Sequence, residues 1–186
     1  MRILFGLSAV VLTCCGASGC GPNDEPSPVQ VAQVQEVPEQ QFFDYTFTET
    51  SAGVVQWILE SDEMKKFTGQ RDAQFTVVKM DFFNDGVHFS TLTADSGSAN
   101  MLVKDVHVWG NVLLLKDNGD RLETEELFFD NKEQLIHNDI FNRTVTNQEV
   151  VTGYGLEATP DLEYIRIKDR AKGYATENVA DESELN

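Results

Sequence analysis

The side chains that could do chemistry in this 186-residue chain are few and widely spaced. The three histidines, His88, His107 and His137, stand 19 and 30 residues apart (107−88 and 137−107), whereas metal-binding histidines recur at short, fixed intervals. Serine and aspartate also occur, but no nucleophile elbow, paired-carboxylate motif or glycine-rich phosphate loop accompanies them. We therefore predict no metal site, no catalytic residue, no cofactor and no enzymatic activity; a secreted hydrolase is the weakest alternative.

All three cysteines lie in the first twenty residues, so nothing after Cys20 can form a disulfide, a thiolate zinc site or a cysteine nucleophile. The N-terminal segment has Arg2, an apolar run from Ile3 to Leu12 and then small residues, which is the order of a secretory signal peptide. The apolar run is about half the roughly 20 residues that a membrane-spanning helix needs. The chain is therefore predicted to be exported, away from cytoplasmic ATP.

The end of this segment, Ala17-Ser18-Gly19-Cys20, resembles a bacterial lipobox, with Ala17 where leucine is commonest. It predicts that residues 1–20 are a lipoprotein signal peptide and that Cys20 is lipidated; plain cleavage nearby is the alternative. Acyl chains on Cys20 would hold the protein at a membrane surface without a transmembrane helix. Residues 21–41 are rich in proline, glutamine and acids, which is typical of a flexible tether.

The acidic composition argues against two kinds of partner. The formal net charge is −17, from 31 acidic and 14 basic residues. Nucleic-acid phosphates require a basic face, and anionic membranes likewise attract lysine and arginine. We predict no nucleic-acid binding and no charge-driven adsorption to membranes.

Glycines recur at a fixed interval after residue 50. Gly53, Gly86 and Gly119 are 33 residues apart (86−53 and 119−86), and Gly153 follows after 34 (153−119). The segments GVVQWILESD and GVHFSTLTAD align without gaps, each ending in a small residue and an aspartate. A fixed period indicates a repeat architecture, in which each unit buries its apolar face by stacking on its neighbours.

The repeat unit is predicted to be β-structure throughout. Apolar and polar residues alternate, and Asp85-Gly86 and Asn118-Gly119 are typical of tight hairpin turns. Gly53 is assigned to a turn as well. Gly110 is predicted to form a bulge within its strand, and Gly153 and Gly155 to kink another. The segment SDEMKKF is compatible with either a helical turn or a strand.

The fold class is therefore all-β, with antiparallel strands of about six to ten residues. The period favours an elongated roll that is open at both ends. It would occupy residues 42–168, followed by an acidic C-terminal tail at 169–186. Unpaired strand edges at both ends are aggregation hazards unless a partner covers them.

Three features together resemble the LptC family, the periplasmic component of the bacterial lipopolysaccharide export machine, and the related LptA/OstA-like domains. They are the Gly-x5-Leu-x-small-Asp segments, VHVWGNVLLLKDNGDRLETEELFFD, and VVTGYGLEATPDLEYIRI. The resemblance covers residues 42–168. It implies a twisted β-jellyroll whose interior takes lipid A acyl chains. It also implies edge pairing with LptF/LptG-type transporter β-domains on one side and an LptA-like bridge on the other.

Two departures from the family pattern concern the membrane anchor. Many members have an N-terminal transmembrane helix, where this chain has the lipobox-like cysteine. Gly21 follows Cys20 where an aspartate would signal inner-membrane retention in enteric bacteria. The resemblance implies that the protein is located at the periplasmic face of the inner membrane. Gly21 does not exclude a location at the outer membrane.

Apolar side chains that face inward would line such a slot. Phe75, counted without gaps from Gly53, matches a position that the family places inside it. The further candidates are Val78, Met80, Phe82, Phe89, Leu92, Val106, Val108, Leu113 and Leu115. A filled core has the same composition as a slot, so a structural or assembly lipoprotein that uses its edges for protein contacts alone remains the alternative function.

Overall fold

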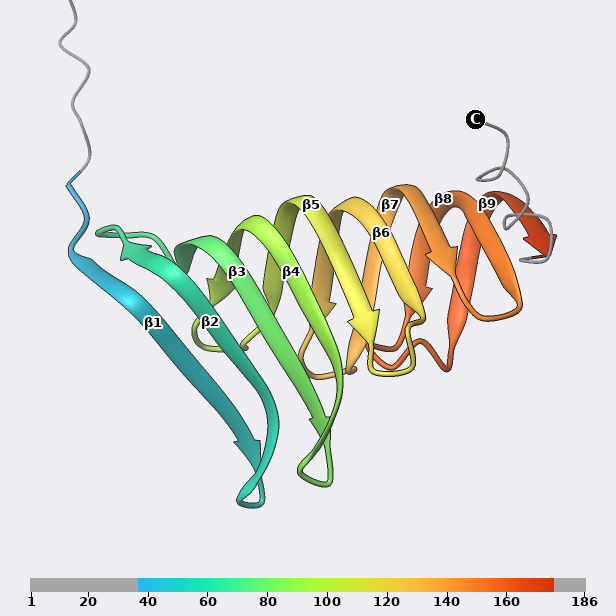
Figure 1. Ribbon diagram of the computed structural model, residues 1–186. Helices are drawn as coiled ribbons and strands as arrows, with labels where there is room; N and C mark the ends of the chain where they lie inside the picture. Colours follow the sequence, from blue (N-terminus) through green and yellow to red (C-terminus); the bar gives the residue numbers. More distant parts are fainter. Residues whose placement is uncertain (1–36, 176–186) are drawn as a thin grey trace, which may run out of the picture. The chain divides into compact units, whose positions relative to one another are not determined.

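The computed structural model describes residues 37–175, which form one antiparallel sheet of nine strands (Figure 1). Every strand pairs only with its neighbours in the sequence, in the order β1 to β9. Within this range no helix is long and apolar enough to cross a membrane. The strands are β1 (Gln40–Ser51), β2 (Val54–Lys66), β3 (Asp72–Asn84), β4 (Val87–Asn100), β5 (Val106–Lys116), β6 (Arg121–Asp130), β7 (Leu135–Val145), β8 (Glu149–Ala158) and β9 (Ile165–Ala175).

The all-β prediction is confirmed, but the strands are longer than expected. They contain 10 to 14 residues, because each one crosses the full width of the sheet. The segment SDEMKKF is strand, since β2 continues to Lys66. The predicted boundaries shift outward as well: β1 begins at Gln40, and β9 pairs with β8 as far as Ala175, past the expected end at Lys168. The predicted signal peptide, Cys20 and most of the predicted tether lie outside the described residues.

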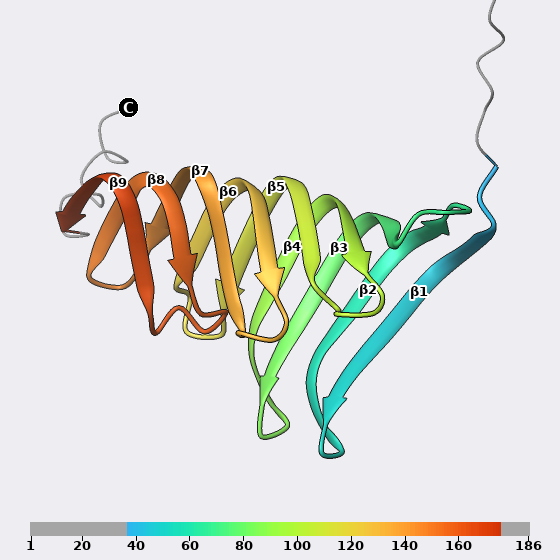
Figure 2. The same ribbon diagram turned by 180° about the vertical axis from the view of Figure 1, so that it is seen from behind.

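The sheet folds over itself along its length. Trp57 of β2 and Phe129 of β6 are not on neighbouring strands, yet their ring centroids are 6.2 Å apart. The rings of Phe82 in β3 and Phe129 are 5.3 Å apart. Figures 1 and 2 show why these distant strands meet: the strands bend over a common ridge and descend on both sides of it. The apolar core lies on the concave face between the two sides, which is the elongated roll that the sequence predicts.

We call the two sides of the ridge arm A and arm B. Arm A consists of the strand halves that meet at the turns 52–53, 85–86, 117–120 and 146–148. Arm B consists of the halves that meet at the turns 67–71, 101–105, 131–134 and 159–164. Each arm therefore has a free margin made of turns, and the two arms are joined along the ridge.

The ridge is a line of irregular backbone at one level of the sheet. Residues with left-handed backbone lie there on β1, β3, β5, β8 and β9, namely Asp44, Val77, Gly110, Asn111, Gly155 and Arg170. From β4 to β9, the register of every strand pair shifts at this level. Such irregularities bend a strand sharply, and because they are adjacent, the whole sheet bends along one line.

The alternation of buried and exposed side chains along a strand shifts by one residue at the ridge. On β3, Phe75 is 3% exposed and Val78 2%, while Val77 between them is 56% exposed. The same break occurs on β2 at Asp62 and on β4 at Asp95, which are both exposed. The small-Asp pair that ends each repeated segment is therefore the point where its strand turns outward and bends. The repeat was visible in the sequence, but its meaning was not.

The predicted turn glycines are found in turns. Gly53 (φ 82°) and Gly86 (φ 79°) follow Ala52 and Asp85, which also have positive φ, so both turns are the primed two-residue type that matches strand twist. Gly119 (φ 92°) closes a longer turn, in which its amide donates to the carbonyl of Lys116 at 3.0 Å. These turns fix the register of three hairpins.

Gly110 lies at the ridge, where the pairing of β5 with β6 shifts between Trp109 and Val112. Its φ is 80°, and a Cβ atom there would be 2.8 Å from Oδ2 of Asp95. The neighbouring Asn111 donates from Nδ2 to the same Asp95 oxygen at 2.7 Å. On β8, a Cβ at Gly153 would overlap Ile167, and Gly155 has φ 68°. Glycine is therefore required at the bends of both strands.

We predict that Gly110→Ala destabilises the fold by about 1 to 3 kcal/mol, because alanine is strained at this φ and displaces Asp95. Urea unfolding of the purified full chain measures the change. Gly173→Ala is the matched control, since a Cβ there would meet nothing closer than Glu149 Oε2 at 3.8 Å. The control should shift stability by less than about 0.5 kcal/mol. Equal effects of the two substitutions would contradict the assignment of Gly110 to the bend.

Candidate functional site

Most of the predicted slot residues face the interior of the roll. Seven of them are at most 3% exposed: Phe75, Val78, Met80, Phe82, Leu92, Val106 and Val108. Phe89 is half-buried at the arm A margin, and its ring stacks on Phe82 with centroids 6.3 Å apart. These side chains come from β3, β4 and β5 on both arms, so the fold collects them into one apolar interior.

Leu113 and Leu115 were predicted to face inward, and this is wrong. Leu115 is 42% exposed, and Leu113 is only half-buried. The inward positions belong instead to Val112 (2% exposed) and Leu114 (0%). The bulge on β5 occupies two residues, Gly110 and Asn111, so the even-numbered positions face inward on both sides of it.

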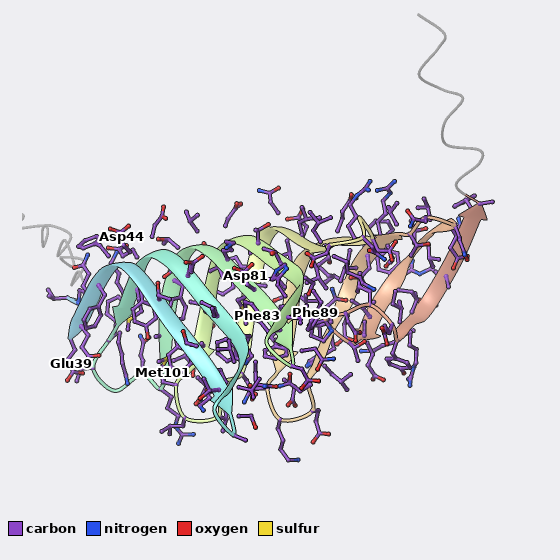
Figure 3. The ribbon with its side chains drawn as sticks, turned by 60° about the horizontal axis from the view of Figure 1, so that its bottom comes forward. Glu39, Asp44, Asp81, Phe83, Phe89 and Met101 are labelled. Carbon is purple, nitrogen blue, oxygen red and sulfur yellow. The ribbon has the colours of Figure 1, made fainter. Side chains whose placement is uncertain are left out.

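A narrow apolar pocket opens at the β1 end of the interior. Its walls come from β1 and β2 on arm A and from β3, the end of β4 and the turn 101–105 on arm B. The lining residues are Tyr45, Phe47, Trp57, Leu59, Phe75, Ala99, Asn100, Met101 and Lys104. Figure 3 labels Met101 close to the ribbons of β1 and β2. The sequence prediction missed Tyr45 and Phe47, although their alternation with threonines was a usable signal.

The interior is closed in this structure. The free volume of the pocket is about 10 Å³, room for about one water molecule. Aromatic rings fill the space behind it in a continuous row across the roll: Phe47 to Trp57 at 5.4 Å, Trp57 to Phe129 at 6.2 Å, and Phe129 to Phe82 at 5.3 Å. Such contacts stabilise beyond simple area burial. The described arms are therefore packed as a core.

The interior becomes polar between β6 and β7. Asn138 and Asn142, at most 1% exposed, exchange amide hydrogen bonds of 2.8 Å in both directions. Asn138 also donates to the Glu126 carbonyl (2.8 Å), and Asn142 to that of Ile140 (2.7 Å). Thr124 donates to the Phe141 carbonyl at 2.9 Å. These carbonyls lie where the β6–β7 ladder is interrupted, so buried side chains replace the missing ladder bonds.

Titratable groups meet on the outer face, near the arm A margin. His88 Nδ1 lies 2.9 Å from Asp117, and His88 Nε2 lies 3.1 Å from the Thr91 hydroxyl. This order resembles a hydrolytic triad, but Thr91 donates its proton to Asp81 at 2.6 Å. Asp81 and Asp117 face opposite nitrogens of the imidazole and so cannot share one ion. Among residues 37–175, no group of three acidic, histidine or cysteine side chains is placed to hold a metal.

The electrostatics of Asp81 are those of a structural ion pair. Burial pushes the pKa of its carboxyl upward, but hydrogen bonds from Lys79 (2.6 Å) and Thr91 outweigh this and leave the pKa below its usual range. Asp81, His88, Thr91 and Asp117 are not among the residues that line the apolar pocket. It is a fixed surface cluster rather than a reaction centre.

For residues 37–175, these observations define an open-ended β-roll with an apolar interior, whose sheet ends at the edge strands β1 and β9. The chain belongs to the LptC family, since the family model described as "Lipopolysaccharide-assembly, LptC-related" matches residues 7–177. Membership implies a role in lipopolysaccharide transport in the cell envelope, in a family of transport proteins rather than enzymes. The comparison with curated proteins gives no match.

We predict that Asp81→Asn lowers stability by about 1 kcal/mol at neutral pH, because it removes a partly exposed ion pair. When folding lowers the pKa of a carboxyl group, its ionised form stabilises the folded state at every pH above the pKa in the unfolded chain, which is about 3.9 for aspartate. The difference between wild type and variant should therefore shrink as the pH falls below about 4. Urea unfolding at several pH values measures it. A difference as large at pH 3 as at pH 7 would contradict the role given to Asp81.

Proposed function

We propose that this protein is a membrane-anchored, non-enzymatic component of the lipopolysaccharide export machine. It receives lipopolysaccharide from an inner-membrane ABC transporter, holds the acyl chains between its arms, and passes them to a periplasmic LptA-like bridge. The observation that carries this proposal is the apolar interior, with a narrow apolar pocket at the β1 end, in a roll of the LptC family.

The chemistry of the interior suits hydrocarbon chains. The buried residues among 37–175 include no charged side chain, and the polar ones are confined to serine, threonine and asparagine. Removing each acyl CH₂ from water contributes about 0.8 kcal/mol, so apolar walls alone supply a large driving force. The phosphorylated sugars of lipopolysaccharide would stay outside, because a buried phosphate without cations is costly. The energy for directed movement comes from ATP hydrolysis on other subunits.

The two edge strands supply the partner contacts. Within the part of the chain that the structure describes, β1 and β9 each have one side without a neighbouring strand. A β-domain of an LptF/LptG-type transporter would add to one edge and the LptA-like bridge to the other, through main-chain hydrogen bonds. Strand addition would extend the sheet and its ridge, so that the concave faces of successive proteins form one continuous surface.

The anchor and location complete the proposal. Lipid on Cys20 and the predicted tether, which would end before β1 begins at Gln40, would place the roll at the periplasmic face of the inner membrane, within reach of the transporter. If these residues form a flexible tether, the roll would be free to move while it stays near its partner.

One observation favours a second function. The interior is filled, with about 10 Å³ free, as expected of an ordinary core. A structural or assembly lipoprotein would use the same edges for protein contacts and would never separate its arms.

Photocrosslinking in living cells separates these two functions. We predict that a benzophenone amino acid at Phe75 or Phe82 forms an adduct with lipopolysaccharide, because both side chains face the interior. The matched control is Val77, which lies two residues from Phe75 on the same strand but is 56% exposed on the ridge. Adducts at both inward positions and none at Val77 support the conduit. No lipopolysaccharide adduct at either inward position would rule it out and leave the structural function.

A further inference from the structure

Three polar ties connect the margins of the two arms. Lys104 Nζ, in the turn 101–105 of arm B, lies 2.6 Å from Glu49 Oε1 of β1. Trp57 Nε1 of β2 donates to Asn131 Oδ1, in the turn 131–134, at 2.9 Å. Ser90 of β4 donates to the carbonyl of Pro160, in the turn 159–164, also at 2.9 Å. The ties therefore form a seam along the roll, opposite the ridge.

The geometry points to the Glu49–Lys104 ion pair as the latch of this seam: its opening lets the arms separate at the β1 end and admits a hydrocarbon chain. The inference rests on the proposed function and deepens it, since it names the two residues that control loading. They are gating residues and need not contact the chain themselves.

The closed pocket requires such an opening. Ligand pockets usually have a volume of about 300 to 1,000 Å³, and the free space here is about 10 Å³. The pocket walls belong to different arms, with Tyr45 and Phe47 on arm A and Phe75 and Met101 on arm B. Space for a chain can therefore arise when the arms move apart. Lys104 itself lines the pocket, so the latch lies directly at its mouth.

Of the three ties, the ion pair is the one that water can replace. The Lys104 side chain is 36% exposed and that of Glu49 15%. In contrast, Ser90 is 0% and Trp57 2% exposed, so breaking their bonds would strand a buried polar group. Water reaches both groups of this ion pair, Glu49 only in part, so it can replace the partner at a lower cost than in the two buried ties. The seam should therefore open first at the β1 end, while the inner ties hold the rest of the roll.

The other residues of the turn 101–105 are also compatible with movement of this turn away from arm A. Leu102 is 83% and Val103 55% exposed, so two apolar side chains stand in water next to the mouth of the pocket. Lys104 has φ 67°, a backbone conformation that a residue with a side chain adopts only at a cost. On the opposite side of the roll, the ridge with its left-handed residues joins the arms and supplies the hinge. Contact of Leu102 and Val103 with a hydrocarbon chain would favour the open state.

Charge reversal tests the latch. The purified full chain is mixed with fluorescent dodecanoate, and uptake is followed by the change in fluorescence. Glu49→Lys and Lys104→Glu each place like charges at the seam, so uptake should become about two- to fivefold faster in each. The double variant restores an ion pair with reversed polarity and should return to the wild-type rate. Equal urea midpoints for the double variant and wild type would show that the fold is unchanged.

Cross-linking supplies the opposite test. In Glu49→Cys/Lys104→Cys, a short bismaleimide locks the seam, and uptake should stop; each single-cysteine variant treated in the same way is the control. Uptake at the wild-type rate by the locked protein, or by both reversal variants, would overturn the latch. If wild type takes up neither dodecanoate nor purified lipopolysaccharide, the proposed function fails together with the latch. If wild type takes up the probe and every variant does so at the same rate, the latch is overturned but the proposed function is not.

Discussion

A sheet with one apolar face can exclude water from that face only by folding over itself, and every strand must then bend at the same level. This constraint explains the ridge of the present structure. Positive φ at Asp44, Val77 and Asn111 would be costly in isolation, but adjacent strands share the bend and hold one another in it. Gly110 is required where the bend brings the backbone against Asp95. The interior, the two arms and the seam between their margins all exist because the strands bend along this ridge.

The regular features of the fold could be predicted from the sequence, because they depend on local preferences. Alternation gave the strands, and the spacing of Gly53, Gly86 and Gly119 gave the hairpins. The direction of side chains beyond a bulge depends on how many residues the bulge contains, which explains the error at Leu113 and Leu115. The end of β9 was missed because its charged residues suit an edge strand as well as they suit a tail.

The candidate site was predictable only in part. Phe75, Val78 and Phe82 follow from alternation, since an inward residue of a half-buried strand is apolar. The amide pair of Asn138 and Asn142 carries no such signal, because asparagine inside a strand is unusual and its reason here is a gap in the ladder that only the folded sheet reveals. The seam also escaped prediction, since Glu49 and Lys104 are 55 residues apart in the chain.

The interior therefore has an apolar pocket at the β1 end and a polar stretch between β6 and β7, and the partly buried Glu49–Lys104 ion pair lies beside the pocket. We propose that lipopolysaccharide passes through this protein on its way from the inner membrane. Newly made, pulse-labelled lipopolysaccharide can be followed in cells depleted of the protein. Labelled lipopolysaccharide should then accumulate at the inner membrane, and its delivery to the cell surface should fall. Delivery at an undiminished rate after depletion would contradict it.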